Sequence, residues 1–392
     1  METINSCRIC KSHEIKTFFD LGSQPLANSL LNSSDTNENV YPLSLSFCKY
    51  CALVQLNQTI KPEILFSNYI WVTGTAKTTV DYSEKFYKAV VDRLFGKKGR
   101  VLEVGSNDGT FLIPFKRAGF EVLGIDPAKN IVDLANKNGI NTKCAFFGKN
   151  LTQDIVAKWG RADVVIARNV LPHVADIRGF VEGLSYCLGK DGILVIEVHY
   201  AKTILEELHY DSIYHEHLCY FTLKSLEYLL WDFGLYPYDL EESPISGGSI
   251  VVFAKKLEVK RTRIYSSFKE MEGKGKVNSL SSWKRFARRT IRHSEELLRI
   301  LNPKKGKSEV VGYGASARSS TLLNFSGINS KLISAIADDN PLKQELYTSG
   351  SHIPIRKTEE VFRSKPEYVI LLAWNFANDI IEKLTQEYSY KG

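Results

Sequence analysis

The residues with the clearest chemical potential lie together in one run of the chain. Tyr214, His215, Glu216 and His217 follow one another, in a segment that holds half of the eight histidines. Imidazole titrates near neutral pH, and a neighbouring carboxylate or phenol can orient it, so the run favours general acid–base chemistry. Metal binding is the competing interpretation, but H-x-H lacks the further ligands that would define a metal site.

The local backbone decides which of these side chains can share a cavity. Alternation along an extended segment would place His215 and His217 on one side and Tyr214 and Glu216 on the other, whereas a turn would bring all of them to one cavity. The two histidines upstream of the run are each expected to be structural, as most single histidines are.

A second candidate site lies at residues 101–112, VLEVGSNDGTFL. The apolar run predicts a buried strand, and Gly105 and Gly109 allow the backbone to approach a ligand closely before a helix begins. Corners of this kind hold nucleotide-like ligands. Because glycine-rich corners are common, the stretch alone leaves a dinucleotide site, a methyl-donor site and a packing turn open.

Asp126 ends the next predicted strand, and a carboxylate there can accept the ribose hydroxyls of an adenosine. The corner EVGSNDG lacks G-x-G-x-x-G, and a sulfonium donor has no pyrophosphate that would need that helix N-terminus. The residues therefore predict an S-adenosylmethionine site. Its expected residues are Glu103, Gly105, Ser106, Asn107, Asp126, Pro127, Phe147 and Asn169.

Two cysteine pairs open the chain. Cys7 and Cys10 form one C-x2-C knuckle, and Cys48 and Cys51 form a second. Each knuckle can present two sulfurs to the same ion, so the pairs predict one structural zinc site in a small domain. A pair of disulfides is the rival, which a reducing cytoplasm disfavours. Four sulfurs leave no open position on the metal, so no zinc-borne catalysis is expected.

Strand and helix signals alternate through the middle of the chain. EVLGIDP, ADVVIARN and GILVIEV are apolar runs that end in polar residues, with helical patterns between them. This alternation predicts an α/β fold with a parallel, doubly wound sheet. Ligands of such sheets sit beyond the carboxyl ends of the strands, where the candidate donor residues fall.

The C-terminal third repeats the strand, glycine turn and helix in SEVVGYGASARSS, and SAIADDNP and YVILLAWN supply two more strands. Together they predict a second, smaller Rossmann-like sheet. Amides after Gly312 and Gly314 would face an anion at a helix N-terminus, which suits a diphosphate, while pure packing is the alternative. SGGS near Ser246 predicts either close approach to a ligand or a tight hairpin.

The net charge of +7 is concentrated in one segment. Residues 255–307 carry an excess of 12 positive charges, so the rest of the chain sums to −5. Trp283, Phe286, Ile291 and Leu298 recur there at helical spacing, which predicts an amphipathic helix whose cationic face is either solvated or attracts phosphate. With no membrane span, leader pattern or RNA-binding motif, we expect a cytoplasmic protein with no membrane or nucleic-acid partner.

Several segments, in order along essentially the whole chain, resemble the nucleotide-sugar C-methyltransferase family, which acts on NDP-4-keto-deoxy sugars. They are CRIC with FFDLGSQPLAN, SFCKYCALVQL, VLEVGSNDGTFL, NVLPHVAD, IYHEHLCYF, SGGSI, and GYGASARS with DDNPLKQ and GSHIPI. The resemblance implies a zinc-binding domain over residues 1–75 and an S-adenosylmethionine-dependent methyltransferase domain over 76–255. It also implies a Rossmann-like domain over 256–392 that helps to hold the nucleotide of the sugar.

The resemblance also implies roles for individual residues. The active-site roles fall on His217, Tyr214, Glu216, His173 and Tyr69, of which the last two also belong to the substrate site. The remaining substrate contacts that it implies are Ser246, Gly247, Gly312, Tyr313, Gly314, Ala315, Arg318 and Asp339.

Two departures from the family pattern concern the nucleotide contacts. Arg318 stands where the family commonly has Lys, and Ser349 stands where a Pro-Gly pair is usual. The expected partner is a nucleotide-linked keto-deoxy sugar, with dTDP as the expected nucleotide, and a monomer is expected.

The expected mechanism is proton abstraction followed by methyl transfer. A ketone at sugar C4 acidifies the C3 proton, His217 removes it, and the enolate carbon attacks the sulfonium methyl. His173 and Tyr69 are candidate donors to the enolate oxygen. O-methylation of a sugar hydroxyl is the runner-up because it too needs a base. A zinc-containing RNA methyltransferase and a non-catalytic ligand sensor are more distant alternatives.

Overall fold

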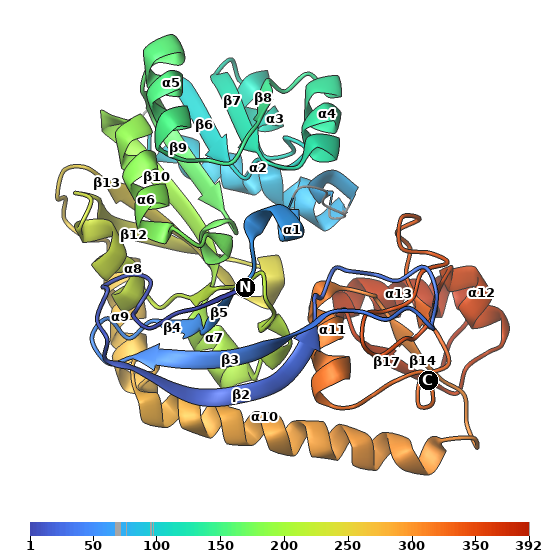
Figure 1. Cartoon of the computed structure of the whole chain (residues 1–392). Coiled ribbons are helices and arrows are strands. Elements are labelled where there is room, and N and C mark those ends of the chain that lie inside the picture. The colour runs from blue at the N-terminus through green and yellow to red at the C-terminus, as the bar shows by residue number, and fades with distance from the viewer. Residues whose placement is uncertain (67–71, 76, 95, 97, 392) are drawn as a thin grey trace.

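The computed structural model describes residues 1–66, 72–75, 77–94, 96 and 98–391. Figure 1 shows a large sheet flanked by helices, a strongly curved N-terminal sheet beneath it, and a smaller sheet unit near the C-terminus. The predicted α/β fold is confirmed.

The central unit is built on a seven-stranded sheet. Its strands, in spatial order, are β12 (Tyr236–Ser243), β13 (Ser249–Lys255), β10 (Leu188–His199), β9 (Ala162–Arg168), β6 (Arg100–Val104), β7 (Glu121–Asp126) and β8 (Thr142–Cys144). The five strands from β10 to β8 pair in parallel, and β13 is antiparallel to both of its neighbours. Their carboxyl ends therefore meet at one edge, where such sheets bind ligands.

Alternate side chains of these strands enter two separate cores, one on each face of the sheet. Val101 and Val164 pack in the core that includes the first two helices of the unit, while Leu102 and Val165 pack in the core of the opposite face. The helices of this unit are α2 (Lys77–Asp92), α3 (Ile113–Arg117), α4 (Lys129–Lys137), α5 (Lys149–Trp159), α6 (Ile177–Cys187), α7 (Ala201–Glu207) and α8 (Leu223–Trp231).

The N-terminal sheet is completed by a strand from far along the chain. Its strands, in spatial order, are β11 (Cys219–Tyr220), β4 (Val54–Leu56), β3 (Val40–Cys48) and β2 (Ile15–Pro25). A two-stranded sheet of β1 (Glu2–Thr3) and β5 (Gln58–Thr59) and the short α1 (Pro62–Phe66) complete the unit. Because β11 follows the candidate catalytic run directly, the N-terminal sheet helps to fix that run in place.

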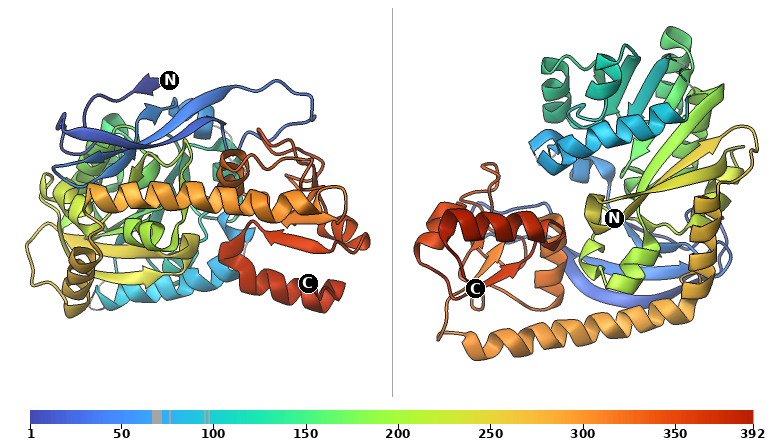
Figure 2. Two further views of the ribbon diagram at one scale, coloured as in Figure 1. Left: turned by 90° about the horizontal axis from the view of Figure 1, so that it is seen from below. Right: turned by 180° about the vertical axis from the view of Figure 1, so that it is seen from behind.

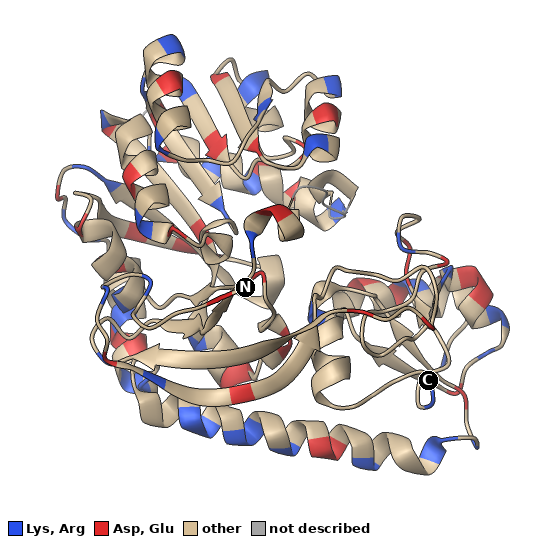
Figure 3. Ribbon diagram, in the orientation of Figure 1, with Lys and Arg blue, Asp and Glu red and all other residues tan. Residues whose placement is uncertain are grey.

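Two helices lead from the central unit to the C-terminal unit. They are α9 (Arg263–Gly275) and α10 (Leu280–Leu301), and the second runs beneath the N-terminal sheet, as the two views of Figure 2 show. Trp283 and Phe286 are buried against aromatic side chains of β2, so the predicted amphipathic helix is confirmed. Ile291, expected on its apolar face, is 45% exposed. Lys and Arg cover much of the outer face (Figure 3).

The C-terminal unit contains the small parallel sheet that its repeated glycine pattern predicts. Its strands, in spatial order, are β16 (Ile355–Arg356), β15 (Ile336–Ala337), β14 (Val310–Tyr313) and β17 (Tyr368–Leu371). Its helices are α11 (Ala317–Phe325), α12 (Thr358–Arg363) and α13 (Ala377–Tyr388). Among the residues that the structure describes, none of the helices combines the length and the apolar character that a membrane crossing requires.

The segment between β2 and β3 reaches across to the C-terminal unit (Figure 1). Leu31 forms a β-bridge with Tyr347, and Ser349 Oγ donates a hydrogen bond to the Leu26 carbonyl at 3.0 Å. Ser349, one of the two departures from the family pattern, therefore lies in the contact between these units.

Candidate active site and zinc centre

One cavity of about 910 Å³ is lined by residues of all three units. The carboxyl ends of the central strands form one wall, the end of the candidate catalytic run forms another, and the start of α11 closes the side of the C-terminal unit. Tyr69, a predicted site residue, lies outside the described residues. The predicted residues that line the cavity are Gly105, Ser106, Asn107, Asp126, Pro127, Phe147, Asn169, His173, Tyr214, His217, Ser246 and Arg318.

The corner after β6 has the shape of a ligand cradle. Gly105 has a φ of +70°, and a Cβ there would lie 3.1 Å from the Val170 side chain. The Asp126 carboxylate accepts the backbone N–H of Asn107 at one oxygen and that of Ala128 at the other, both at 3.0 Å. Burial raises its pKa. The carboxylate is thus held at the cavity wall with lone pairs left to accept hydroxyl groups, which fits the ribose of an adenosine.

Two hydrogen bonds that connect residues 73 and 74 to this corner were not predicted from the sequence. The backbone N–H of Thr73 donates to Asn107 Oδ1 at 2.8 Å, and that of Gly74 donates to Asp108 Oδ2 at 2.9 Å. Thr73 also lines the cavity. Neither residue belongs to a motif, and both contacts join positions 34 residues apart, so only the fold reveals them.

Glu103 lies beneath the cavity and not in its lining. It is 1% exposed, and burial raises its pKa to about 8. Beside it, Arg168 forms an ion pair with Glu197 at 2.7 Å and lies over the Phe111 ring, 3.0 Å from the centroid. Glu103, Arg168 and Glu197 form a buried polar layer beneath the glycine corner after β6, which we call the donor corner. Unpaired charges would be costly there.

Tyr214 and His217 form a hydrogen-bonded pair across a turn. The Tyr214 hydroxyl lies 2.8 Å from His217 Nε2, and His217 Nδ1 lies 2.7 Å from the Ser212 carbonyl oxygen. Because a carbonyl oxygen only accepts, Nδ1 carries the proton and Nε2 accepts from the phenol. Burial lowers the pKa of His217 well below its ordinary value and raises that of Tyr214 well above its own. His217 is therefore a neutral imidazole at pH 7, and its ring lines the cavity.

Two further groups support this pair. The His173 ring lies 4.9 Å from the His217 ring, and burial lowers the pKa of His173 to about 4. Asn28 Nδ2 donates to Glu216 Oε1 at 2.6 Å, and Asn28 itself lines the cavity, whereas Glu216 is buried behind its wall. The N-terminal unit thus contributes a side chain to the site. Asn28 lies in a recognised motif, FFDLGSQPLAN, yet was not predicted as a site residue.

His215 faces away from the cavity. Its Nε2 lies 3.2 Å from the Pro42 carbonyl oxygen, and its ring packs edge-on against Tyr41. The alternation that would pair His215 with His217 is wrong, because the chain turns here and the backbone N–H of His217 bonds to the Tyr214 carbonyl at 2.9 Å. The turn brings only the first and last side chains of the run to the cavity wall.

In the second glycine corner, residues 312–315, packed side chains and the carboxylate of Asp338 occupy the space beside the backbone. Gly314 has a φ of +95°, and a Cβ there would lie 2.4 Å from the Ala373 Cβ. The backbone N–H of Ala315 donates to Asp338 Oδ2 at 2.8 Å. The cavity wall on this side is instead formed by the start of α11. The predicted substrate residues that lie outside the described lining are Gly247, Gly312, Tyr313, Gly314, Ala315 and Asp339.

Arg318 connects the C-terminal unit to the central unit at the cavity. Its guanidinium pairs with Asp211 at 3.0 Å and donates to the Ser246 carbonyl at 2.8 Å. Trp374 Nε1 donates to the other oxygen of Asp211 at 2.7 Å. The long Arg side chain, present in place of the usual Lys, thereby makes two directed contacts that a single ammonium could not make in the same planar geometry. Asp211 and Trp374 were not predicted.

The four predicted zinc ligands come together at one point. The Sγ atoms of Cys7, Cys10, Cys48 and Cys51 all lie within 4.8 Å of one another, with 3.5 Å from Cys7 to Cys51 and from Cys10 to Cys48. A tetrahedron with Zn–S bonds of about 2.3 Å separates its sulfurs by about 3.8 Å. The cysteines are free, and the donor set fits zinc.

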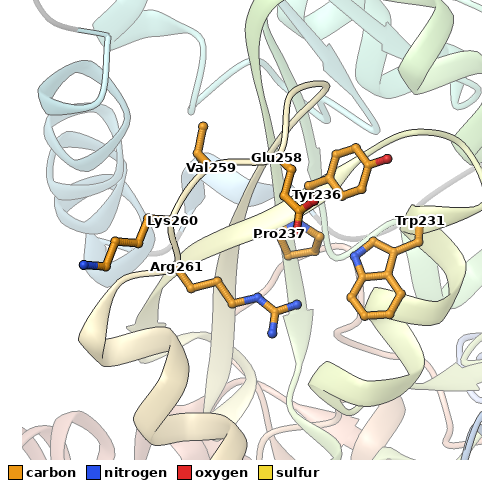
Figure 4. A pocket seen from close by; sticks show the side chains of 7 residues that line it. All are labelled: Trp231, Tyr236, Pro237, Glu258, Val259, Lys260 and Arg261. Atoms are coloured by element: carbon orange, nitrogen blue, oxygen red, sulfur yellow. The ribbon is translucent and has the colours of Figure 1, made fainter.

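A second, smaller cavity of about 460 Å³ lies at the junction of β12 with the segment that precedes α9 (Figure 4). Its Arg261 side chain is paired with Glu227 at 2.9 Å. None of its lining residues lines the large cavity. They are Trp231, Tyr236, Pro237, Glu258, Val259, Lys260 and Arg261.

Three family models match the chain in succession. A model described as a zinc binding domain matches residues 7–66, a methyltransferase domain matches residues 80–240, and a C-methyltransferase C-terminal domain matches residues 244–392. The first contains the four cysteines, the second contains both the donor corner and the catalytic run, and the third contains the second glycine corner.

Individual relatives agree with this division. C-methyltransferase NovU of Streptomyces niveus is 34% identical over 387 residues, which cover 97% of this chain and 92% of NovU. A ubiquinone biosynthesis O-methyltransferase of Rhodopseudomonas palustris is 29% identical over 97 residues, covering 25% of this chain and 38% of that enzyme.

Two solved structures that match the chain each cover less than half of it. Magnesium protoporphyrin IX methyltransferase of Synechocystis PCC 6803 is 16% identical with a TM-score of 0.35, over 45% of this chain and 78% of that chain. An S-adenosylmethionine-dependent methyltransferase of Clostridium acetobutylicum is 11% identical with a TM-score of 0.37, over 46% and 93%.

Proposed function

The chain belongs to the S-adenosylmethionine-dependent C-methyltransferases that carry an N-terminal zinc-binding domain, and from this premise we propose its acceptor and its chemistry. The acceptor is a nucleotide-linked 4-keto-deoxy sugar, with dTDP as the nucleotide, in deoxysugar biosynthesis. The methyl group is added to the carbon next to the ketone, at C3. The observation that carries the proposal is the Tyr214–His217 pair, which opens into the same cavity as the donor corner.

The far side of the cavity suits an anionic acceptor. Arg318, Lys343 and the N-terminal residues of α11 line it, and Lys149 lines it from the central unit. Arg318 is paired with Asp211 and Lys343 with Asp338, so part of this positive charge is already balanced. Cationic side chains and a helix N-terminus favour phosphate groups, because unbonded N–H groups and positive charge point toward them. A volume of about 910 Å³ gives room for a donor and an acceptor that bind side by side.

The chemistry requires a base, and His217 supplies it. The bound S-adenosylmethionine would supply a methyl group on a positively charged sulfur. His217 Nε2 takes the proton from the carbon next to the ketone once the Tyr214 hydroxyl has turned its hydrogen away from this nitrogen, while Nδ1–H remains on Ser212 and fixes the ring. Tyr214 orients the imidazole, and Asn28 holds Glu216 behind it. A positioned base of this kind contributes about a hundred- to ten-thousand-fold in rate.

His173 is placed to donate to the developing enolate oxygen. Its ring lines the cavity beside His217, and with a pKa of about 4 it is neutral at pH 7, so it donates from one nitrogen without competing for the proton. Such donors stabilise the charge that forms in the transition state. The zinc centre, closed by four sulfurs, holds the N-terminal unit together and leaves the chemistry to the cavity.

The test is turnover with defined acceptors. The enzyme is incubated with S-adenosylmethionine and a panel of dTDP-4-keto-deoxy sugars, and S-adenosylhomocysteine formation is measured. We expect it only with keto-sugar nucleotides. Turnover that requires RNA, or a free sugar hydroxyl in place of the ketone, would contradict the proposal.

A further inference from the structure

Three polar side chains connect the cavity to the protein surface. His199, at the end of β10, lines the cavity. Its Nε2 lies 3.2 Å from His209 Nδ1, and His209 Nε2 lies 3.1 Å from Glu207 Oε2. The His209 side chain is 4% exposed, whereas that of Glu207 is 60% exposed. The series therefore runs from the cavity wall through buried protein to solvent.

The outer carboxylate fixes which nitrogens carry protons. An ionised carboxylate only accepts, so His209 carries its proton on Nε2 and has its lone pair on Nδ1. His199 must then donate from Nε2, which leaves its own lone pair on Nδ1. The series is set to receive a proton at His199 and to deliver one at Glu207.

Burial and nearby charges disfavour the protonated form of both imidazole rings. Burial first, and Arg318 next, lower the pKa of His199 well below its ordinary value and lower that of His209 as well. Asp211 and Glu207 act in the opposite direction on His209. Both rings are therefore neutral before proton transfer begins, as a proton path requires. Within the series, the carboxylate of Glu207 is the group at the exposed end.

Among the described residues, the hydrogen bonds of His217 do not continue to solvent. Its Nδ1–H is bonded to the carbonyl of Ser212, which cannot take up a proton, and Nε2 accepts from the half-buried phenol of Tyr214. His217 and His199 line the same cavity, and a charge on His217 lowers the pKa of His199, so the two rings are within electrostatic reach. Every C-methylation leaves one proton at this base.

Resting on the function proposed above, we propose that His199, His209 and Glu207 form the path by which the proton taken from the substrate carbon leaves for solvent. The C–H electron pair becomes the enolate and then the new C–C bond, while the S–CH3 bond breaks and its electrons stay on sulfur. The proton passes from His217 through water in the cavity to His199 Nδ1. His199 gives its Nε2 proton to His209, His209 gives its Nε2 proton to Glu207, and Glu207 releases it to water.

The path predicts that proton abstraction and proton loss can be separated. With dTDP-4-keto-6-deoxyglucose and S-adenosylhomocysteine in D2O, His217 abstracts and returns a proton without methyl transfer, and exchange with solvent labels the carbon next to the ketone. We expect Glu207→Gln and His209→Asn to slow this labelling by about tenfold or more. The matched control is Glu206→Gln, which changes the neighbouring carboxylate, bonded to Lys202 outside the path.

Two further readouts exclude a merely structural effect. In a single turnover with S-adenosylmethionine the variants transfer the first methyl at nearly the rate of the unaltered enzyme, since abstraction by His217 is intact. Their steady-state rate is lower and is restored by added imidazole, which carries the proton in place of the path. Glu207 is an exposed residue, so Glu207→Gln tests the path without a folding defect.

Two outcomes would overturn the path, and they are distinguishable. If the unaltered enzyme labels and methylates no keto-sugar nucleotide, the proposed function is wrong and the path is wrong with it. If the unaltered enzyme is active and both variants label the substrate at its rate, the proton leaves by another route and the path alone is wrong.

Discussion

The described part of the chain contains the same kind of glycine corner twice, and of these two only the corner after β6 lines the large cavity. After β6, Asp126 accepts one amide of the corner and one amide two residues beyond itself. After β14, Asp338 accepts the amide of Ala315 in the corner and the amide of Asn340, also two residues beyond itself. The two arrangements are locally alike, although they belong to different sheets.

The difference lies in what else reaches each carboxylate. Asp338 also pairs with Lys343 at 3.3 Å and lies outside the cavity lining. Asp126 lines the cavity, and within the described part of the chain it is in no ion pair. A glycine corner therefore does not by itself identify a ligand site. Asp126, which faces the cavity and has no ion pair among the described residues, still has the capacity to accept hydroxyl groups.

The largest expected effect concerns the proposed base, His217, which lies in neither glycine corner. His217→Asn should lower turnover by about a hundred- to ten-thousand-fold, because it removes the basic nitrogen. S-adenosylmethionine affinity, measured by calorimetry, should be nearly unchanged. His215→Asn is the matched control, since His215 belongs to the same run but faces away from the cavity. Activity retained by His217→Asn, or lost equally in His215→Asn, would remove His217 from the role of base.

The next effect compares the two carboxylates directly. Asp126→Asn should weaken S-adenosylmethionine binding by about tenfold to a hundredfold, the loss expected for hydrogen bonds to a charged group. Asp338→Asn should leave that affinity unchanged, because its carboxylate bonds only to its own unit. Equal losses of affinity in the two variants would show that the corners do not differ as the cavity lining indicates.

A smaller effect concerns the glycines of the second corner. Gly314→Ala should lower the free energy of unfolding by about 1–3 kcal/mol, because it adds a Cβ against Ala373 at positive φ. Gly327→Ala is the control: its φ is +67° but nothing lies within 4 Å of the added Cβ, so only the backbone cost remains. Urea unfolding measures both. Equal losses would mean that close packing does not explain the glycine at position 314.

The last expected effect is a pH dependence of stability. The pKa of His173 is about 4 in the folded chain, below the value of about 6.5 in the unfolded chain, so the unfolded state binds more protons between these values. Stability should therefore fall by about 1.4 kcal/mol per pH unit for this ring as pH drops below about 6.5. The slope of urea-unfolding free energy against pH should decrease in His173→Asn. An unchanged slope would contradict a neutral, half-buried His173.

Much of the fold was predictable because it depends on local patterns. Apolar runs that end in polar residues correctly predicted the parallel sheets, and the two C-x2-C knuckles correctly predicted one cluster of sulfurs. Ile291 shows the limit of periodicity. It recurs at helical spacing with Trp283 and Phe286, yet it is 45% exposed, whereas its neighbour Thr290 is fully buried.

A residue of the candidate site was predictable only where a single local motif identified it. Asp126 and His217 follow directly from the ends of strands and from the catalytic run. Asn28 reaches Glu216 across 188 residues, and Trp374 reaches Asp211 across 163, so no local pattern could signal either contact. The orientation of His215 depends on one turn, which composition does not determine.

The central claim is methyl transfer to a carbon that has lost its proton, and one labelling measurement tests it most directly. A dTDP-4-keto-deoxy sugar that carries deuterium at C3 is converted with S-adenosylmethionine bearing a 13C methyl group, and the product is examined by NMR. The account predicts a carbon-bound methyl at C3 and complete loss of the deuterium from that position. An oxygen-bound methyl with the deuterium retained would contradict it.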